Sequence, residues 1–325
     1  AEGYTNYITS DKGSGLSVTS STAELTAKNN SISAGGKYGI IASNSSVTLT
    51  ANGGVNYIGG GTFSGIQAAK GAVVTLKKNG TADENGLANY IESEKGSGLS
   101  ASDANTQIIL DVEEGNNVVS GNGSFAITST AANGGIELDT KAGDNVVYND
   151  NAAGIGINVG TNSSVSMYTD QGNNAVIGSG YYGVYLTSGD FRMDTNEGSN
   201  SISITNASGI GVFSQNGGKV TLNAVNGDNE ILSENQKEGI HSFDSTVTLN
   251  AENGNNLISA QNYGIWTTAY WGKQYGFDHN TVQLSGVNNN IFATAENGIG
   301  IFANRNADMT DYSSIVHMTA NGGDN

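Results

Sequence analysis

One short phrase recurs along the whole chain and limits what it can fold into. Each copy opens with Asn-x-Ile or Asn-x-Val, continues with Gly and an aliphatic residue, and ends in Val-x-Leu and a turn. Repeats spaced 24 to 35 residues apart predict a solenoid, a propeller or another array of stacked units. We take the opening Asn of successive copies to be Asn6, Asn30, Asn56, Asn89, Asn117, Asn145, Asn174, Asn200, Asn229, Asn256 and Asn290, with Asn325 starting a further copy.

The segments between the turns have the pattern of short β-strands. Residues 47–51, 220–224 and 247–251 alternate apolar and polar side chains and are rich in Val and Thr. Such a strand cannot bury its apolar face alone, but stacked copies pair equivalent strands in parallel, about 4.8 Å apart. No segment carries a helical period. The sequence therefore predicts an all-β fold, a right-handed parallel β-helix that is a single-stranded solenoid with three short strands in each of about 11 coils.

The turn before each opening Asn is a further signal. Sequences such as Gly143-Asp144-Asn145 and Gly227-Asp228-Asn229 indicate one corner geometry repeated in every coil. Asn tolerates the left-handed backbone region, and its amide can hydrogen-bond to the same Asn one coil away. Because each Asn stands two positions before an inward Ile or Val, we expect an internal Asn ladder.

Composition indicates the number of domains and argues against several classes of function. The chain has 325 residues, 47 Gly, no Pro, no Cys and a formal net charge of -17. A repeat array is quasi-one-dimensional, so we expect a single domain over 1–325, with loop insertions at 77–88, 268–281 and 302–315. The few Lys and Arg are scattered, which argues against nucleic acid as a partner. The absence of Cys excludes a disulfide framework and thiol catalysis. Both ends lack a polar cap, so we expect a segment of a longer array.

The coil pattern also carries a family resemblance. Asn-x-Ile, Gly-Ile and Val-Thr-Leu-x-Ala, in a chain rich in Gly and Asn, resemble the β-helix passenger domains of bacterial autotransporter adhesins over the whole chain. The AIDA-type and self-associating autotransporters are the nearest comparison. The resemblance implies display at the cell surface, with membrane attachment only through a C-terminal barrel absent from this sequence. It also implies adhesion, autoaggregation or biofilm formation, with a copy of itself on a neighbouring cell, or a host or bacterial glycan or protein, as partner.

An enzyme is the rival interpretation, because the same fold carries polysaccharide lyases and hydrolases. Three or more carboxylates within roughly 10 Å beside His279 or Arg305 would favour such an enzyme, with a shallow cleft at the insertions. The sequence shows no serine-protease motif, and its His residues fall in different coils. We expect a non-catalytic protein without a cofactor.

Two consecutive insertions are the strongest candidates for ligand binding. The stretch from the Gly-Ile strand to the next Val-x-Leu is longer in the last two phrases, and the insertions must emerge side by side. Aromatic, amide and carboxylate groups there suit a sugar or a protein partner; local packing against coil edges is the alternative. The candidates are Trp266, Tyr270, Trp271, Lys273, Tyr275, Phe277, Asp278, His279, Arg305, Asp308 and Tyr312.

Outward positions on the strands supply further candidates. The residue after each opening Asn faces out, and an apolar stripe there marks an interface. Outward Thr residues form a weakly charged wall that could hydrogen-bond to an identical wall. The self-association candidates are Tyr7, Tyr57, Tyr90, Thr48, Thr75, Thr221 and Thr248. On the second strand, Tyr185, His241 and Trp266 are expected to share one outer face.

A metal site has weaker support. The outward position after each Val-x-Leu carries Asp111 and Asp139 on neighbouring coils, and Ca²⁺ between them would relieve their repulsion. The alternative is a solvated polar row, continued by residues such as Thr26 and Asn250. We favour the solvated row, since the Ca²⁺-binding nonapeptide of other β-solenoids is missing.

Overall fold

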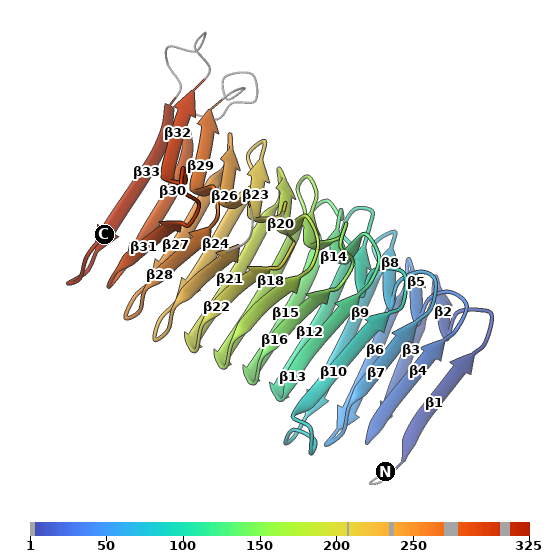
Figure 1. Ribbon diagram of the computed structural model, residues 1–325. Helices are drawn as coiled ribbons and strands as arrows, with labels where there is room; N and C mark the ends of the chain where they lie inside the picture. Colours follow the sequence, from blue (N-terminus) through green and yellow to red (C-terminus); the bar gives the residue numbers. More distant parts are fainter. Residues whose placement is uncertain (1–3, 207, 234–236, 270–278, 306–312) are drawn as a thin grey trace.

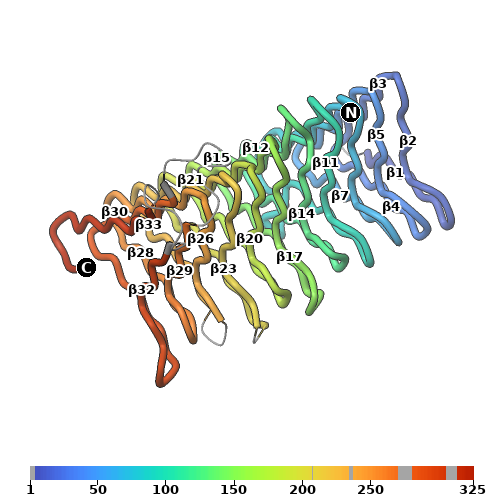
Figure 2. The backbone as a smooth tube through the Cα atoms, turned by 90° about the horizontal axis from the view of Figure 1, so that it is seen from above, coloured from blue at the N-terminus to red at the C-terminus, as the bar shows by residue number. Residues whose placement is uncertain are grey.

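The chain forms an elongated stack of coils. The computed structural model describes residues 4–206, 208–233, 237–269, 279–305 and 313–325. Three parallel sheets, each of eleven strands, run the length of the stack, and every coil contributes one strand to each sheet (Figure 1). Figure 2 shows the coils following one another along the axis, with the two termini at opposite ends. The predicted parallel β-helix is confirmed.

The first sheet holds the strands that open each coil: β1 (Thr5–Ser10), β4 (Asn29–Ala34), β7 (Asn56–Gly60), β10 (Leu87–Ser93), β13 (Asn116–Gly121), β16 (Asn145–Asn149), β19 (Asn174–Gly178), β22 (Asn200–Ile204), β25 (Asn229–Ser233), β28 (Asn256–Ala260) and β31 (Asn289–Ala293). The second sheet holds β2 (Leu16–Thr19), β5 (Ile40–Ser43), β8 (Ile66–Ala69), β11 (Leu99–Ala101), β14 (Phe125–Ser129), β17 (Ile155–Val159), β20 (Tyr182–Thr187), β23 (Ile210–Gln215), β26 (Glu238–Phe243), β29 (Tyr263–Ala269) and β32 (Ile299–Arg305). The third sheet holds β3 (Thr22–Ala27), β6 (Ser46–Asn52), β9 (Val73–Asn79), β12 (Gln107–Glu114), β15 (Gly135–Ala142), β18 (Ser164–Gln171), β21 (Asp190–Glu197), β24 (Lys219–Ala224), β27 (Thr246–Ala251), β30 (His279–Gly286) and β33 (Ser313–Ala320).

The core lies inside the coils and consists of aligned rows of aliphatic side chains. In the third sheet, Leu49, Leu76 and Leu110 stand above one another and are fully buried. Each fully buried aliphatic side chain contributes about 1.5–3 kcal/mol relative to an exposed one. Since the side-chain period along a strand is two, the same alternation directs polar residues to the outer face.

The predicted Asn ladder is also confirmed, with one correction. Each ladder Asn donates from Nδ2 to Oδ1 of the Asn in the next coil at 2.7 to 3.0 Å, from Asn6 through to Asn325. The ladder residue in β31 is Asn289 and not Asn290, which faces outward beside Leu257. Three consecutive Asn residues precede Ile291, and only Asn289 has the inward side chain that the Asn-x-Ile pattern requires.

The corner before the ladder needs glycine in several coils. Gly172 has φ of 150°, and a Cβ built on it would lie 2.0 Å from the carbonyl oxygen of Gly143 in the coil below. No side chain fits at that separation. The repeated Gly-Asp/Asn-Asn turn is therefore required by the close stacking of the corners.

At the first predicted insertion, the strands end at other residues than the sequence predicts. β9 continues to Asn79 and β10 begins at Leu87, so the loop here spans 80–86 and is shorter than the expected 77–88. Lys77 remains in the outward row of β9, while the side chain of Lys78 is buried and donates to the carbonyl of Thr81. In the other two insertions, 270–278 and 306–312 lie outside the described residues. Among the described residues, there is no helix that could cross a membrane.

Candidate functional site

An aromatic row runs along the outer face of the second sheet. Register aligns Tyr185, Phe213, His241, Trp266 and Phe302 on successive strands from β20 to β32. The predicted shared face of Tyr185, His241 and Trp266 is confirmed, while Phe213 and Phe302 were not anticipated. Neighbouring rings in the row have centroids 4.9 to 5.7 Å apart. Tyr182 and Tyr263 pack beside the row.

This packing limits what the aromatic row can bind. Tyr185 stacks on Phe213 and His241 stacks on Trp266, with interplanar angles of 5° and 7°. The other side of Trp266 meets Phe302 edge-on. Sugars stack on exposed ring faces, whereas here the faces cover one another. The row therefore ties neighbouring coils together.

A buried carboxylate lies within this aromatic packing. Glu238 is fully buried, between Ile210 and Tyr263 on the adjacent strands. Its Oε2 lies 2.7 Å from Nδ1 of His241, and Oε1 lies 3.6 Å from Nζ of Lys237. Neither Oε atom makes a hydrogen bond of regular geometry within the described residues. The imidazole of His241 and the ammonium of Lys237 are thus the basic groups that approach this buried carboxyl group.

The insertion candidates are mostly beyond the described part of the chain. Trp266 is placed, in the aromatic row. Eight other insertion candidates lie outside the described residues: Tyr270, Trp271, Lys273, Tyr275, Phe277, Asp278, Asp308 and Tyr312. Of His279 and Arg305, only the backbone is described, at the start of β30 and the end of β32. Whether carboxylates converge beside them stays a prediction.

The tyrosines of the first sheet form part of one outward row, as the sequence predicts. Tyr7, Tyr57 and Tyr90 lie on this row with Ser31 and Val118. Tyr57 stacks on Tyr90 with ring centroids 5.7 Å apart, and its hydroxyl donates to Glu92. Burial, and then the contact with Glu92, raise the pKa of Tyr57 above its ordinary value. Tyr7 is 72% exposed.

The threonine candidates lie on one outward row of the third sheet. Thr48 and Thr75 are neighbours on β6 and β9, and Thr221 and Thr248 are neighbours on β24 and β27. All four are half-buried. The row between the two pairs carries Ile109, Glu137, Ser166 and Arg192, so the Thr wall is interrupted.

The acidic pair considered for Ca²⁺ also lies as predicted, side by side on β12 and β15. Asp111 and Asp139 are direct register partners, and Lys77 approaches Asp111 to 3.9 Å. Burial, followed by repulsion from Glu137 and Asp111, raises the pKa of Asp139. Within the described ranges, no group of three or more His, Asp or Glu side chains could hold a metal ion.

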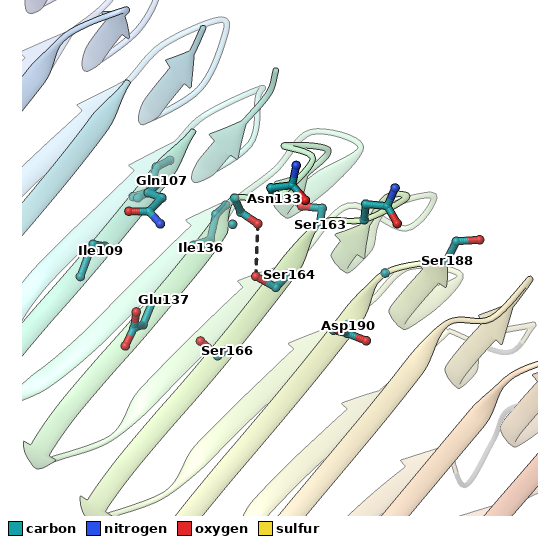
Figure 3. Close-up of a pocket in the computed structure, with 15 residues that line it drawn as sticks. Gln107, Ile109, Asn133, Ile136, Glu137, Ser163, Ser164, Ser166, Ser188 and Asp190 are labelled. Carbon is teal, nitrogen blue, oxygen red and sulfur yellow. Dashed lines mark hydrogen bonds between the residues drawn. The ribbon is translucent and has the colours of Figure 1, made fainter. Parts of the chain in front are cut away.

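A polar groove on the third sheet was not anticipated from the sequence. It has a volume of about 660 Å³ and crosses β12, β15, β18 and β21 (Figure 3). One outward row there reads Gln107, Gly135, Ser164 and Asp190. Because Gly135 has no side chain and its neighbour Ser164 has a small one, the surface is lowered between taller residues.

The floor and rim of the groove come from different elements. Glu137 and Ser166 project from the next outward row of β15 and β18. The rim is a set of turns between the second and third sheets, where Asn133, Asn162 and Ser188 have φ of 52° to 56°. Figure 3 shows these turns along one side, with Ser164 bonded to the carbonyl of Gly134 at 3.2 Å. Hydroxyl, amide and carboxylate groups thus dominate the lining.

Charges around the groove are unevenly paired. Lys141 lies 3.7 Å from Glu113, and Arg192 pairs with Asp194. Glu137 and Asp190 take part in none of the ion pairs among the described residues. The groove therefore presents two carboxylates that form no ion pair within the described residues, and Lys219, the register neighbour of Asp190, forms none either.

Comparison with protein-family models, curated proteins and solved structures finds no match to this chain.

Proposed function

We propose that this chain is part of a bacterial cell-surface adhesin, a non-catalytic rod that mediates adhesion, autoaggregation or biofilm formation. The observation that supports it best is the continuous pairing of strands in three eleven-stranded parallel sheets. Equivalent outward side chains repeat about every 4.8 Å along the rod. Such a surface can make many weak contacts at once, which suits adhesion between two extended surfaces.

The face that we propose for contact with a second copy lies on β24, β27 and β30. Its outward rows carry uncharged polar groups: Thr221, Thr248 and Gln283 in one row, and Asn223, Asn250 and Ser285 in the next. Two copies of this chain repel each other, because each has a formal net charge of -17. Repulsion is weakest where neutral hydroxyl and amide groups meet, and these groups both donate and accept hydrogen bonds.

Display on cells tests this function. Cells that carry the chain on a neutral surface scaffold are expected to settle faster than cells with the scaffold alone, and faster again as added salt screens the repulsion. Attachment to glycan and matrix-protein arrays is measured on the same cells. A chain that produces neither settling nor attachment at any salt concentration would contradict the proposal.

A pair of matched variants tests the contact face. Thr221→Glu with Thr248→Glu adds two charges to the proposed face and is expected to abolish settling. Ser201→Glu with Ser203→Glu adds two charges to the first sheet, where both side chains are half-buried and outward. If both double variants lose settling equally, the loss is due to net charge, and the proposal that the face on β24, β27 and β30 makes the contact is wrong.

A further inference from the structure

The polar groove over β12, β15, β18 and β21 has the size of a ligand site and a lining of hydroxyl, amide and carboxylate groups. Its volume of about 660 Å³ lies within the usual range for small-molecule sites. Three steps between neighbouring strands span about 14 Å along the rod, which suits a short chain molecule better than a single ring. The groove is therefore a place where an elongated ligand can lie parallel to the axis.

The backbone of the floor is not free to bind a ligand. The floor strands lie in the middle of the third sheet, and β15 and β18 are hydrogen-bonded to a parallel strand on both sides. An extended peptide binds most simply by adding a strand to an open sheet edge, and no such edge exists in the groove. Recognition here depends on side chains of Ser, Asn and Gln, which match the hydroxyl groups of a saccharide.

The charge of the groove selects among saccharides. Glu137 and Asp190 are exposed carboxylates that form no ion pair within the described residues. Lys219, the register neighbour of Asp190, is not paired with it, and Arg192 is engaged by Asp194. An acidic saccharide would be repelled, whereas a saccharide with several ammonium groups would be attracted and could donate a hydrogen bond to each carboxylate from a different ammonium group.

We propose that this groove binds an amino-sugar oligosaccharide, with free amino groups directed at Glu137 and Asp190 and sugar hydroxyls at Ser164, Ser166 and Gln107. The inference rests on the proposed function, since it names the ligand class of one adhesive site. It assigns binding to coils that contain neither of the two long C-terminal insertions.

Calorimetric titration of the full chain tests the ligand class. The probes are tetramers of glucosamine, of N-acetylglucosamine and of galacturonic acid, and a Lys-containing tetrapeptide. The glucosamine tetramer is expected to bind most tightly, more weakly as salt is raised, and the galacturonate tetramer not at all. Failure of the glucosamine tetramer to bind, equal binding of all three saccharides, or preference for the peptide would overturn the proposal.

Variants locate the binding. The double variant Glu137→Gln with Asp190→Asn is expected to weaken binding of the glucosamine tetramer about tenfold. Each of its two substitutions replaces a charge-assisted hydrogen bond with a neutral one. Ser166→Tyr fills the groove from an outward strand position and is expected to abolish binding. The controls are Glu24→Gln, on the outward row of Glu137, and Ser46→Tyr, on the outward row of Gln107, and both are expected to bind like the parent. Equal losses in variants and controls would remove the groove as the site.

The outcomes separate this inference from the proposed function. If the chain binds no amino-sugar tetramer but cells that display it still aggregate or attach, the adhesin function stands and the proposed ligand of the groove is wrong. If the chain binds the tetramer in the groove but cells that display it neither aggregate nor attach, the ligand proposal stands and the adhesin function is wrong.

Discussion

At the scale of single residues, the ladder Asn side chains are buried polar groups that hydrogen-bond to the coils on both sides. Asn200 is fully buried and makes three bonds: it accepts from Asn174 at 2.9 Å and donates to Asn229 at 2.9 Å and to the carbonyl of Asn223 at 2.8 Å. Both amide hydrogens and the oxygen are thus used. A buried group that loses its only partner costs about 1–3 kcal/mol.

Replacement of Asn200 by Ala is expected to lower the free energy of unfolding by about 3 kcal/mol, because it leaves ladder partners on both sides unsatisfied. Urea titration followed by circular dichroism measures the change. Ser201→Ala, at the next and outward position of the same strand, is the control and is expected to change stability by less than about 0.5 kcal/mol. Similar losses in the two variants would mean that the ladder contributes no special stability.

Asp139 gives a prediction for pH. Burial, and then Glu137 and Asp111, raise its pKa above the ordinary value of 3.8, so the fold favours the protonated carboxyl more than the unfolded chain does. Its contribution to stability is therefore greatest below pH 3.8 and falls as pH rises through the folded pKa. Asp139→Asn is expected to stabilise the protein at neutral pH by less than about 1 kcal/mol, with no gain in acid.

Thermal unfolding of the parent and of Asp139→Asn over a pH series measures this difference. Asp11→Asn removes the same formal charge from an exposed position near one end, and its effect is subtracted as the contribution of net charge. A stabilisation by Asp139→Asn that persists unchanged into acid would show that the raised pKa is not its cause.

At the scale of elements, the aromatic row joins strands β20, β23, β26, β29 and β32 of the second sheet through ring contacts. The Phe213 ring contacts Tyr185, Tyr182 and His241 at centroid distances of 5.2, 5.5 and 5.0 Å. Such aromatic pairs contribute about 0.5–1.5 kcal/mol each beyond area burial. Phe213→Ala is expected to cost about 2 kcal/mol and to speed amide hydrogen exchange in β20, β23 and β26.

The control for the aromatic row lies one coil before it begins. Asn158 is the register partner of Tyr185 and makes a single side-chain bond, to Thr128 at 3.1 Å. Asn158→Ala is expected to change stability by less than about 0.5 kcal/mol and to leave exchange in β23 unaltered. If exchange accelerates equally in both variants, the row does not couple the strands.

The strands and their stacking could be predicted because they depend on a period that is written in the sequence. Asn-x-Ile fixes which residues point inward, and equal spacing fixes which coil stacks on which. The one error in the ladder, Asn290 for Asn289, arose in a run of three Asn residues, where the Asn-x-Ile spacing to Ile291 selects Asn289 and could have found it. The strand end at Asn79 was missed because Lys77 and Lys78 do not resemble the Thr and Ala of other coils.

The groove and the aromatic row were harder to predict, since each depends on which residues become neighbours across strands. Phe213 stands three residues after Ile210, as Tyr185 stands three after Tyr182, and this spacing is a signal that could have found it. The groove arises from Gly135 beside Ser164, and a lone Gly in one strand does not reveal a lowered surface. Glu238 gave no signal, because its burial depends on the rings packed around it.

At the scale of the whole molecule, each coil contacts mainly the coils above and below it. Every sheet is built from pairs of consecutive coils, so stability is close to a sum over coils and the interfaces between them. Residues 30–55 form one complete coil of three strands, β4, β5 and β6. Its removal would bring Asn56 onto Asn6, and β7 onto β1, with every inward residue still inward.

Deletion of residues 30–55, a unit of 26 residues set by the spacing from Asn30 to Asn56, is expected to leave a folded rod with a slightly lower melting temperature. Deletion of Thr48 alone is expected to do more damage. It shifts the second half of β6 by one position and turns Leu49 and Ala51 away from the core, because the side-chain period along a strand is two. Circular dichroism and thermal unfolding of the two variants decide between these outcomes. If the complete-coil deletion is the more destabilised of the two, the stability of the rod is not a sum over coils.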